Sequence, residues 1–348
     1  MALPFETHIV IFPFMAQGHT LPLLDLSKAL SRHQIRVSII TTPGNAKSIS
    51  NYIASYPHVY VIEIPFPTVD GLPKGCENTS QLPSVEFHLP FINATKQLRK
   101  PPFQNIIQTM LDSQTPPICV ISDFFLGWTL AVCRALDVPR LVFHGMDVLS
   151  MAICKYTWVH QPHLKAKSVS DPLHLPGVKL PFTLTSAELP ETVNKQNQDD
   201  LLSKLIEEVG EANANSWGVV VNSFEELEKS HILCFESFYS EAKAWCLGPL
   251  FLYEEMEDLE KRNFSMLMQW LVEQITPDSV IYVSFGTQAD VSDTQLDEVA
   301  FGLKESGFPF VWLVRSKTWT LPGGMEEKIK GKGLIIREWV DQRRILCQ

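Results

Sequence analysis

The sequence lacks the patterns that mark membrane, secreted or nucleic-acid-binding proteins. No uninterrupted apolar run approaches the roughly 20 residues that a transmembrane helix needs. The first residues, MALPFETHIVIFPF, place no basic segment before their apolar run, so no signal peptide is expected. The net charge is −10, from 29 Lys and Arg against 39 Asp and Glu, which argues against nucleic acid or an anionic membrane as a partner. The seven cysteines are scattered and form no CxxC motif, which indicates reduced thiols and a cytoplasmic protein.

Several familiar site motifs are also missing from the sequence. There is no GxGxxG, which argues against a nicotinamide oxidoreductase, and no GxxxxGK[ST] phosphate loop. A GxSxG nucleophile elbow and a DxD-like metal–phosphate pair are absent too. His160 and His163 are separated by Pro162, which forbids a clean helical pair of metal ligands. We therefore expect no metal site.

The pattern of apolar segments predicts two α/β domains with doubly wound parallel sheets. His8–Phe12 is expected to form a buried strand, followed by a helix that begins near Thr20 and a second strand at Arg36–Thr41. Further strands are expected at 59–64, 118–122, 140–143, 218–222, 279–285, 310–314 and 334–336. We predict a first domain over residues 1–248, a linker over 249–265 with an acidic stretch, and a second domain over 266–348. Residues 160–195 are expected to be surface loops that could line a pocket.

One edge of the first sheet is predicted to carry a histidine and an aspartate. His19 follows the first strand, and Asp123 follows the strand Ile118–Ser122. Because ligands bind at the carboxyl ends of parallel strands, the two side chains suit a general base and its orienting carboxylate. The nearby helix N-terminus is expected to favour the neutral imidazole. The alternative is that His19 caps a loop and Asp123 caps the following helix.

A second candidate site follows the first strand of the second domain. The residues there are Ser284, Phe285, Gly286 and Thr287. Their main-chain N–H groups and hydroxyls suit a phosphate, although an ordinary turn has the same composition.

Several ordered motifs resemble the plant UDP-dependent glycosyltransferases, which glycosylate small secondary metabolites. The resemblance covers essentially the whole chain. It is carried by Phe12–His19, Ser122–Trp128, Val221–Glu228, Trp245–Pro249, and Ser279–Thr287 with Phe310–Trp312.

The resemblance implies a GT-B fold, in which two Rossmann-like domains bind the acceptor and the UDP-sugar. His19 matches the family's catalytic base and Asp123 its partner, and the implied reaction inverts the anomeric centre. UDP-sugar is a co-substrate, with UDP-glucose the commonest donor, and no cofactor or metal is expected. The implied acceptor is a small phenolic such as a flavonoid. We expect a monomer.

The resemblance also assigns ligand contacts. Trp339 would stack on uracil, the main chain of Val340 would pair with the base edge, and Gln342 would reach the ribose. Thr287, with Ser284 and Gly286, would approach the phosphates. Phe14, Phe124 and Phe143 are candidate acceptor-pocket aromatics, with the hydrophobic core as the alternative place for each.

The chain departs from the family pattern at its C-terminal end. It stops at Gln348, within the donor-binding box that begins at Trp339, and the family's His-Cys-Gly-Trp-Asn-Ser segment is absent. Asp341 stands where proline is commoner. From the sequence we expect a C-terminally truncated second domain. The alternative function is an inactive or fragmentary homologue that at most binds the acceptor.

Overall fold

The computed structural model describes most of the chain, and it separates into two compact units. The described residues are 7–190, 193, 201–240, 242–253, 266–274, 276, 278–286, 289, 291–316, 318–338, 340 and 342–346. Unit 1 comprises residues 1–254 and unit 2 residues 255–348.

Unit 1 is built on a seven-stranded sheet in which all pairs are parallel. Its order is β3-β2-β1-β4-β5-β6-β7, so the strand order reverses between β1 and β4. The strands are β1 (His8–Phe12), β2 (Arg36–Thr41), β3 (Val59–Glu63), β4 (Cys119–Asp123), β5 (Arg140–His144), β6 (Gly218–Val221) and β7 (Lys243–Cys246). This is the doubly wound α/β class that the sequence predicts.

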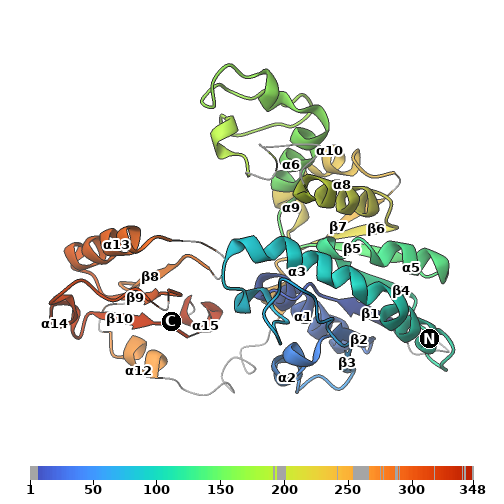
Figure 1. Cartoon of the computed structure of the whole chain (residues 1–348), viewed down its shortest axis with the longest axis horizontal. Coiled ribbons are helices and arrows are strands. Elements are labelled where there is room, and N and C mark those ends of the chain that lie inside the picture. The colour runs from blue at the N-terminus through green and yellow to red at the C-terminus, as the bar shows by residue number, and fades with distance from the viewer. Residues whose placement is uncertain are drawn as a thin grey trace. The chain divides into compact units, whose positions relative to one another are not determined.

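Helices connect these strands and cover both faces of the sheet (Figure 1). They are α1 (Gln17–Arg32), α2 (Pro43–Tyr52), α3 (His88–Thr95), α4 (Gln104–Leu111), α5 (Thr129–Ala135), α6 (Val148–His160), α8 (Leu201–Ala214), α9 (Glu225–Glu228) and α10 (Ile232–Glu236).

Strand β1 shows how the sequence produces two cores. Val10 and Phe12 pack in one hydrophobic cluster with residues of α3, α4 and α5, whereas Ile9 and Ile11 pack in another with α1 and α2. Because successive strand residues point to opposite faces, an uninterrupted apolar strand must be covered on both sides. The continuous run His8–Phe12 is therefore the sequence signal for the buried central strand.

Helix α1 begins earlier than the sequence predicts, at Gln17 and not near Thr20. The carbonyl oxygen of Ala16 accepts hydrogen bonds from the N–H groups of both His19 and Thr20, which closes the first turn. The Thr20 hydroxyl donates to the carbonyl of Phe14 at 3.1 Å and does not cap the helix. His19 therefore lies in the first helical turn and not in the loop before it.

The end of unit 1 contains a strand that the sequence pattern does not reveal. Strand β7 is short, and none of its four residues is fully buried, so it lacks an apolar run. Trp245 of β7 packs over Gly218, where an added Cβ would lie 2.1 Å from Cζ3 of the indole. Leu250, which the sequence places in the linker, is buried against α1 in the turn η8 (Leu250–Tyr253), and residues 254–265 of that linker lie outside the described part of the chain.

Unit 2 contains a three-stranded parallel sheet in the order β10-β9-β8. Its elements are β8 (Ile281–Ser284), β9 (Phe310–Leu313), β10 (Gly333–Ile336), α12 (Met266–Val272), α13 (Asp293–Ser306), α14 (Met325–Ile329) and α15 (Gln342–Leu346). A capping box begins α13: Ser292 Oγ accepts from the N–H of Gln295, and Gln295 Oε1 accepts from the N–H of Ser292. Alternate residues of β9 again fill two hydrophobic clusters.

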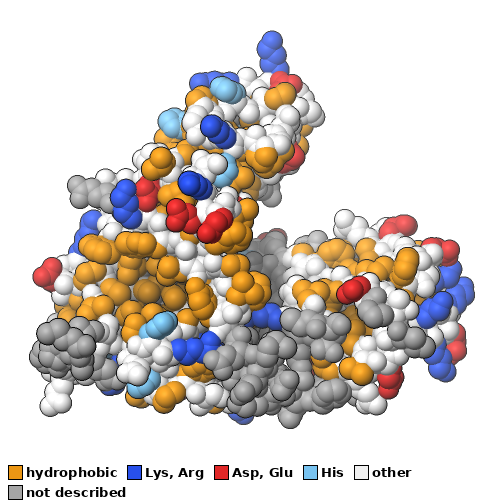
Figure 2. All heavy atoms as spheres, turned by 180° about the vertical axis from the view of Figure 1, so that it is seen from behind, with side chains coloured by type: hydrophobic (Ala, Val, Ile, Leu, Met, Phe, Trp, Pro, Cys, Tyr) orange, Lys and Arg blue, Asp and Glu red, His pale blue; other side chains and the backbone are white. Residues whose placement is uncertain are grey.

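The surface of unit 1 keeps some apolar area. Figure 2 shows hydrophobic side chains gathered on one face of this unit. Throughout the described residues, no helix combines the length and apolar character needed to cross a membrane.

The aromatic packing beneath the β1–β4 edge gives a stability prediction. Phe103 is fully buried, with its ring 5.5 Å from that of Phe12 and 5.4 Å from that of Trp128. Phe103→Ala should lower the free energy of unfolding of unit 1 by about 3–5 kcal/mol, because it removes this contact and leaves a cavity. Leu233→Ala is the matched control, because that side chain is 78% exposed and its loss should cost less than about 0.5 kcal/mol. Urea denaturation followed by circular dichroism measures both, and equal midpoints for the two variants would contradict the prediction.

Candidate active site

The sheet topology brings His19 and Asp123 together. Strands β1 and β4 are neighbours, with Phe12 paired to Ser122, and the strand order reverses between them. His19 follows β1 in the first turn of α1, and Asp123 is the last residue of β4. In open parallel sheets this switch point opens a crevice at the carboxyl ends of the strands, where ligands bind.

The two side chains form a direct hydrogen bond. His19 Nδ1 lies 2.8 Å from Asp123 Oδ2, and the other carboxylate oxygen accepts the N–H of Phe125 at 3.0 Å. The Asp123 side chain is fully buried, while that of His19 stays 25% exposed. Because Nδ1 donates to the carboxylate, Nε2 carries the lone pair and is the nitrogen that can accept a proton. The geometry is that of a base held by a buried carboxylate.

Asp123 also sets the proton affinity of His19. Burial alone would lower the pKa of His19, but the charge of Asp123 and its hydrogen bond outweigh burial and raise the pKa above its ordinary value. By itself, the helix N-terminus beside His19 is expected to favour the neutral imidazole. The nearby carboxylate shifts the balance the other way, because it stabilises the imidazolium at hydrogen-bond distance.

Three phenylalanine rings surround the His19 imidazole. Ring centroids lie 5.5 Å away for Phe14, 5.6 Å for Phe124 and 5.5 Å for Phe125. Phe14 and Phe124 were candidates from the sequence, whereas Phe125 was not. Phe14 is only 2% exposed and belongs to a core cluster, which is the alternative place left open for it. Phe143, the third candidate, is fully buried in the cluster that packs against α1, which is the core position left open as its alternative.

Phe125 reaches the site because of the local backbone. Phe124 and Phe125 lie in η5 (Phe124–Leu126), a 3₁₀ turn capped by the Asp123 side chain, and their rings approach to 4.2 Å. The sequence motif Ser122–Trp128 contains the signal, but which of its rings faces His19 depends on this turn, whose side-chain spacing differs from that of an α-helix or a strand.

Behind Phe124 lies a second histidine that the sequence analysis did not single out. The ring of His144 stacks on Phe124 at 5.3 Å, and its Nε2 is hydrogen-bonded to the Tyr239 hydroxyl at 3.0 Å. Burial, with smaller contributions from Lys155 and Arg140, lowers the pKa of His144 well below its ordinary value. This imidazole is therefore neutral and supports the aromatic wall.

The predicted donor-binding residues lie in unit 2. Ser284 is the exposed last residue of β8, and the N–H of Gly286 points to its hydroxyl at 3.4 Å with φ at +79°. Val340 packs beside the cluster that contains Ile345, and Gln342 is the exposed first residue of α15. Because β8 and β10 are parallel members of one sheet, the segments that follow them leave the same edge. Thr287 and Trp339 lie outside the described residues.

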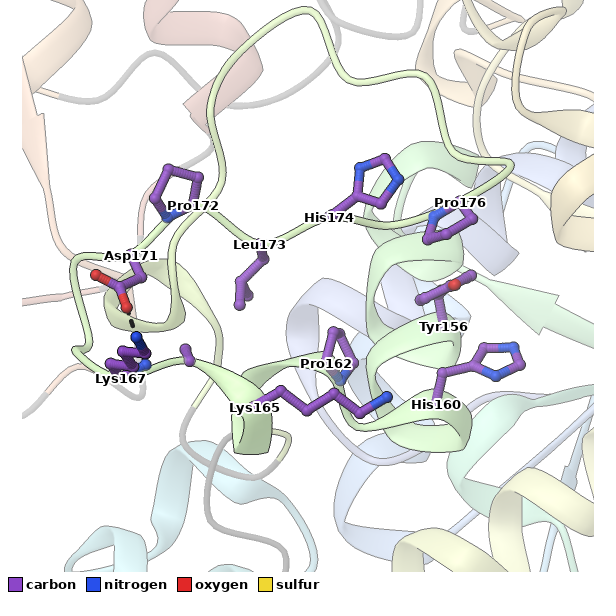
Figure 3. Close-up of a pocket in the computed structure, with 11 residues that line it drawn as sticks. Tyr156, His160, Pro162, Lys165, Lys167, Asp171, Pro172, Leu173, His174 and Pro176 are labelled. Atoms are coloured by element: carbon purple, nitrogen blue, oxygen red, sulfur yellow. Dashed lines mark hydrogen bonds between the residues drawn. The ribbon is translucent and has the colours of Figure 1, made fainter.

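The described residues also contain a surface cavity of about 580 Å³, between the end of α6 and the loop 161–176. Figure 3 shows Tyr156 and His160 from the helix on one side and Asp171 and Lys167 from the loop on the other. The sequence predicts surface loops over residues 160–195 that could line a pocket. Asp171 accepts the main-chain N–H of Lys167 at 2.9 Å, so its carboxylate is used to shape the loop. Residues 148 and 160 are about 18 Å apart along α6, which separates this cavity from the strand edge that precedes the helix.

No metal centre is formed by the described side chains, where groups of three or more His, Cys, Asp or Glu suited to a metal are absent. The six cysteines that the structure describes are all free thiols.

Comparison with known proteins identifies the class of protein to which this chain belongs. A family model described as "Glycosyltransferase, N-terminal domain" matches residues 6–252. The chain is 36% identical to UDP-glycosyltransferase 73B4 of Arabidopsis thaliana, over 98% of this chain and 74% of the relative. It is 33% identical to UDP-glucose flavonoid 3-O-glucosyltransferase 7 of Fragaria ananassa, over 98% and 70%. The chain therefore belongs to the plant UDP-glycosyltransferase family, and it is a glycosyltransferase.

A solved structure supports the same assignment. The crystal structure of Glycyrrhiza uralensis UGT73P12, complexed with glycyrrhetinic acid 3-O-monoglucuronide, matches with a TM-score of 0.82 and 26% sequence identity. The match covers 98% of this chain and 70% of that chain. The architecture is accordingly the GT-B α/β fold, as the resemblance of the sequence implied.

Proposed function

We propose that this glycosyltransferase transfers glucose from UDP-glucose to a hydroxyl group of a small phenolic acceptor such as a flavonoid, with inversion at the anomeric carbon. The observation that carries the proposal is the 2.8 Å contact between His19 and the buried Asp123 at the β1–β4 switch point. The similarity to a flavonoid glucosyltransferase supports the choice of acceptor and donor.

The proposed reaction is a single displacement. Nε2 of His19 accepts the proton of the acceptor hydroxyl as its oxygen attacks the anomeric carbon. A new carbon–oxygen bond forms while the bond to UDP breaks, and UDP leaves with the electron pair. Asp123 stabilises the imidazolium and holds the ring so that Nε2 stays directed at the acceptor. Attack opposite to the leaving group inverts the configuration.

Donor binding is proposed to need neither a metal nor a cofactor. Hydroxyl and main-chain N–H donors of Ser284, Gly286 and Thr287 would stabilise the diphosphate. By similarity to the family, Trp339 would stack on uracil and Val340 and Gln342 would contact the base edge and ribose. We accordingly propose that residues 1–248 bind the acceptor and 266–348 the UDP-sugar, joined by the linker 249–265, in a protein that acts as a monomer.

The proposal is tested by product analysis with the purified chain. Incubation with UDP-glucose and a panel of flavonols, followed by liquid chromatography and mass spectrometry, should yield monoglucosides. Because the donor is α-linked, the proton coupling at the new anomeric centre should show a β-glucoside. An α-glucoside would contradict inversion. Acceptor binding measured by calorimetry without any product would favour the alternative of a non-catalytic homologue.

The aromatic wall around His19 gives a prediction for acceptor binding. Phe125 is half-buried beside the His19 ring, so Phe125→Ala should remove stacking area for a phenolic ring and raise the acceptor KM about tenfold. The UDP-glucose KM should change little. Phe301→Ala is the matched control, since its side chain is 45% exposed on α13 of unit 2. Steady-state kinetics measure both KM values. An unchanged acceptor KM in Phe125→Ala would exclude Phe125 from the acceptor site.

A further inference from the structure

The turn that carries Asp123 is held from behind by a buried arginine. Arg140, the first residue of β5, is 1% exposed. Its guanidinium donates to Ser122 Oγ at 2.8 Å, to Asn213 Oδ1 at 3.0 Å, to Ser216 Oγ at 2.6 Å and to the carbonyl oxygen of Asp123 at 3.3 Å. One side chain thus connects β4, β5 and the end of α8, and its planar fork matches four oxygen atoms.

The same group of residues fixes the rest of the turn. Asn213 donates from Nδ2 to the carbonyl oxygen of Phe124 at 3.2 Å. Ser122 is hydrogen-bonded to the Thr129 hydroxyl at 2.8 Å, and Thr129 donates to the carbonyl oxygen of Leu126. The carbonyl groups of residues 123, 124 and 126 are therefore held by contacts that begin at Arg140 and α8.

The acceptors of Arg140 are all neutral, which is unusual for a fully buried cation. Burial of a charge costs free energy that neutral hydrogen bonds offset only in part. Burial lowers the pKa of Arg140 to about 10, and the negative charge of Asp123 opposes the fall. The guanidinium stays protonated at neutral pH, so a fixed positive charge lies behind the Asp123 carboxylate.

We propose that Arg140 is a positioning residue for sugar transfer, which fixes the 122–126 turn and favours the deprotonated state of the His19–Asp123 pair. The proposal rests on the proposed function, because that function makes His19 the base. The neutral contacts explain the first role, and the fixed charge explains the second: a positive charge near a titrating pair makes loss of its last proton easier.

The other titratable groups around Arg140 do not replace its charge. Burial raises the pKa of Cys133 on α5 to about 12, and it raises that of Tyr239 further, so both are neutral. His144 on β5 is neutral because burial lowers its pKa. Lys155 on α6 lies 4.5 Å from the centre of the Tyr239 ring, and burial lowers its pKa to about 8. Lys155 is protonated below that pH with or without Arg140, so it contributes equally to all variants compared at acidic pH.

Removal of the charge gives a signed test. In Arg140→Met the acid limb of the profile of kcat/KM against pH should move to higher pH by about one unit. Arg140→Lys keeps the charge but loses the planar fork, so its limb should stay in place while kcat falls. Asn213→Ala is the matched control, because it removes hydrogen bonds to Arg140 and Phe124 without changing any charge, and its limb should also stay in place. Should Arg140→Met not fold, Arg140→Gln tests the same point with an amide that can still hydrogen-bond.

A measurement that does not need turnover separates this proposal from the proposed function. Titration of the His19 ring by NMR, assigned with His19→Asn, should show the same upward shift in the neutral Arg140 variants. An unshifted titration, or equal shifts in Arg140→Met and Arg140→Lys, would overturn the effect of the Arg140 charge on the pair, and an unchanged kcat in Arg140→Lys would overturn its role in fixing the turn. Both results would leave the proposed function intact. Full transfer activity in His19→Ala would refute the base itself, and the NMR titration would still report whether Arg140 sets the proton affinity of the pair.

Discussion

Replacing His19 with alanine should lower kcat for sugar transfer by about 10²–10⁴-fold, the usual contribution of a positioned general base. The reason is geometric: the Nδ1 of His19 is bound to Asp123 at 2.8 Å, so the ring offers its other nitrogen to the acceptor hydroxyl. The acceptor KM should change much less, because the variant removes a proton acceptor and leaves the phenylalanine wall. Steady-state assays with UDP-glucose and a flavonol at saturating donor measure both constants.

The control for this prediction is a histidine at the other end of the same helix, just outside it. His33 is the exposed residue that follows α1, and His33→Ala should retain full activity. Circular dichroism and thermal unfolding of both variants establish that they are folded. A His19→Ala protein with kcat within threefold of the unchanged chain would show that some other group accepts the proton.

Asp123→Asn should reduce kcat by a similar factor, about 10²–10⁴-fold, and should also move the pH profile. An amide can turn its NH₂ group toward His19 and favour the wrong tautomer, and it carries no charge to stabilise the imidazolium. Because Asp123 raises the pKa of His19, its replacement should lower that pKa. The base must be neutral to act, so the acid limb of activity should move to lower pH.

This shift is opposite in sign to the one expected for Arg140→Met, which makes the pair of variants diagnostic. Loss of the negative charge of Asp123 lowers the proton affinity of the imidazole. Loss of the positive charge of Arg140 raises the proton affinity of the His19–Asp123 pair. Profiles of kcat/KM from pH 5 to 9 distinguish the two. An acid limb in Asp123→Asn that stays in place, or moves to higher pH, would contradict the electrostatic account of the dyad.

The strand edge that carries the dyad was predictable from the sequence because its signals are local. A run of apolar residues from Ile9 to Phe12, a helix and a second strand specify a parallel unit, and parallel strands present their carboxyl ends at one edge. The sequence could not specify that β1 and β4 are neighbours, because this pairing joins residues separated by more than 100 positions. Because the two strands are neighbours, the side chains of His19 and Asp123 lie within 2.8 Å of each other.

Other features depend on the packed structure and left no local pattern. The start of α1 at Gln17 follows from hydrogen bonds to the carbonyl oxygen of Ala16, an alanine without a capping side chain. The position of Phe125 beside His19 depends on a 3₁₀ turn. Nothing in the sequence distinguishes Arg140 from any other residue at the start of a strand. Phe143 looked like a site aromatic because it lies near the strand end, but strand alternation directs it into the core.

The short turn η5 has a consequence for how such an enzyme can change. One carboxylate oxygen of Asp123 accepts a hydrogen bond from Nδ1 of His19, and the other accepts one from the main-chain N–H of Phe125, whose ring lies 5.5 Å from that of His19. The carboxylate that tunes His19 and an aromatic ring beside His19 therefore belong to a single peptide segment. Substitutions within residues 124–126 would therefore also disturb the hydrogen bonds that hold Asp123 and, through it, His19.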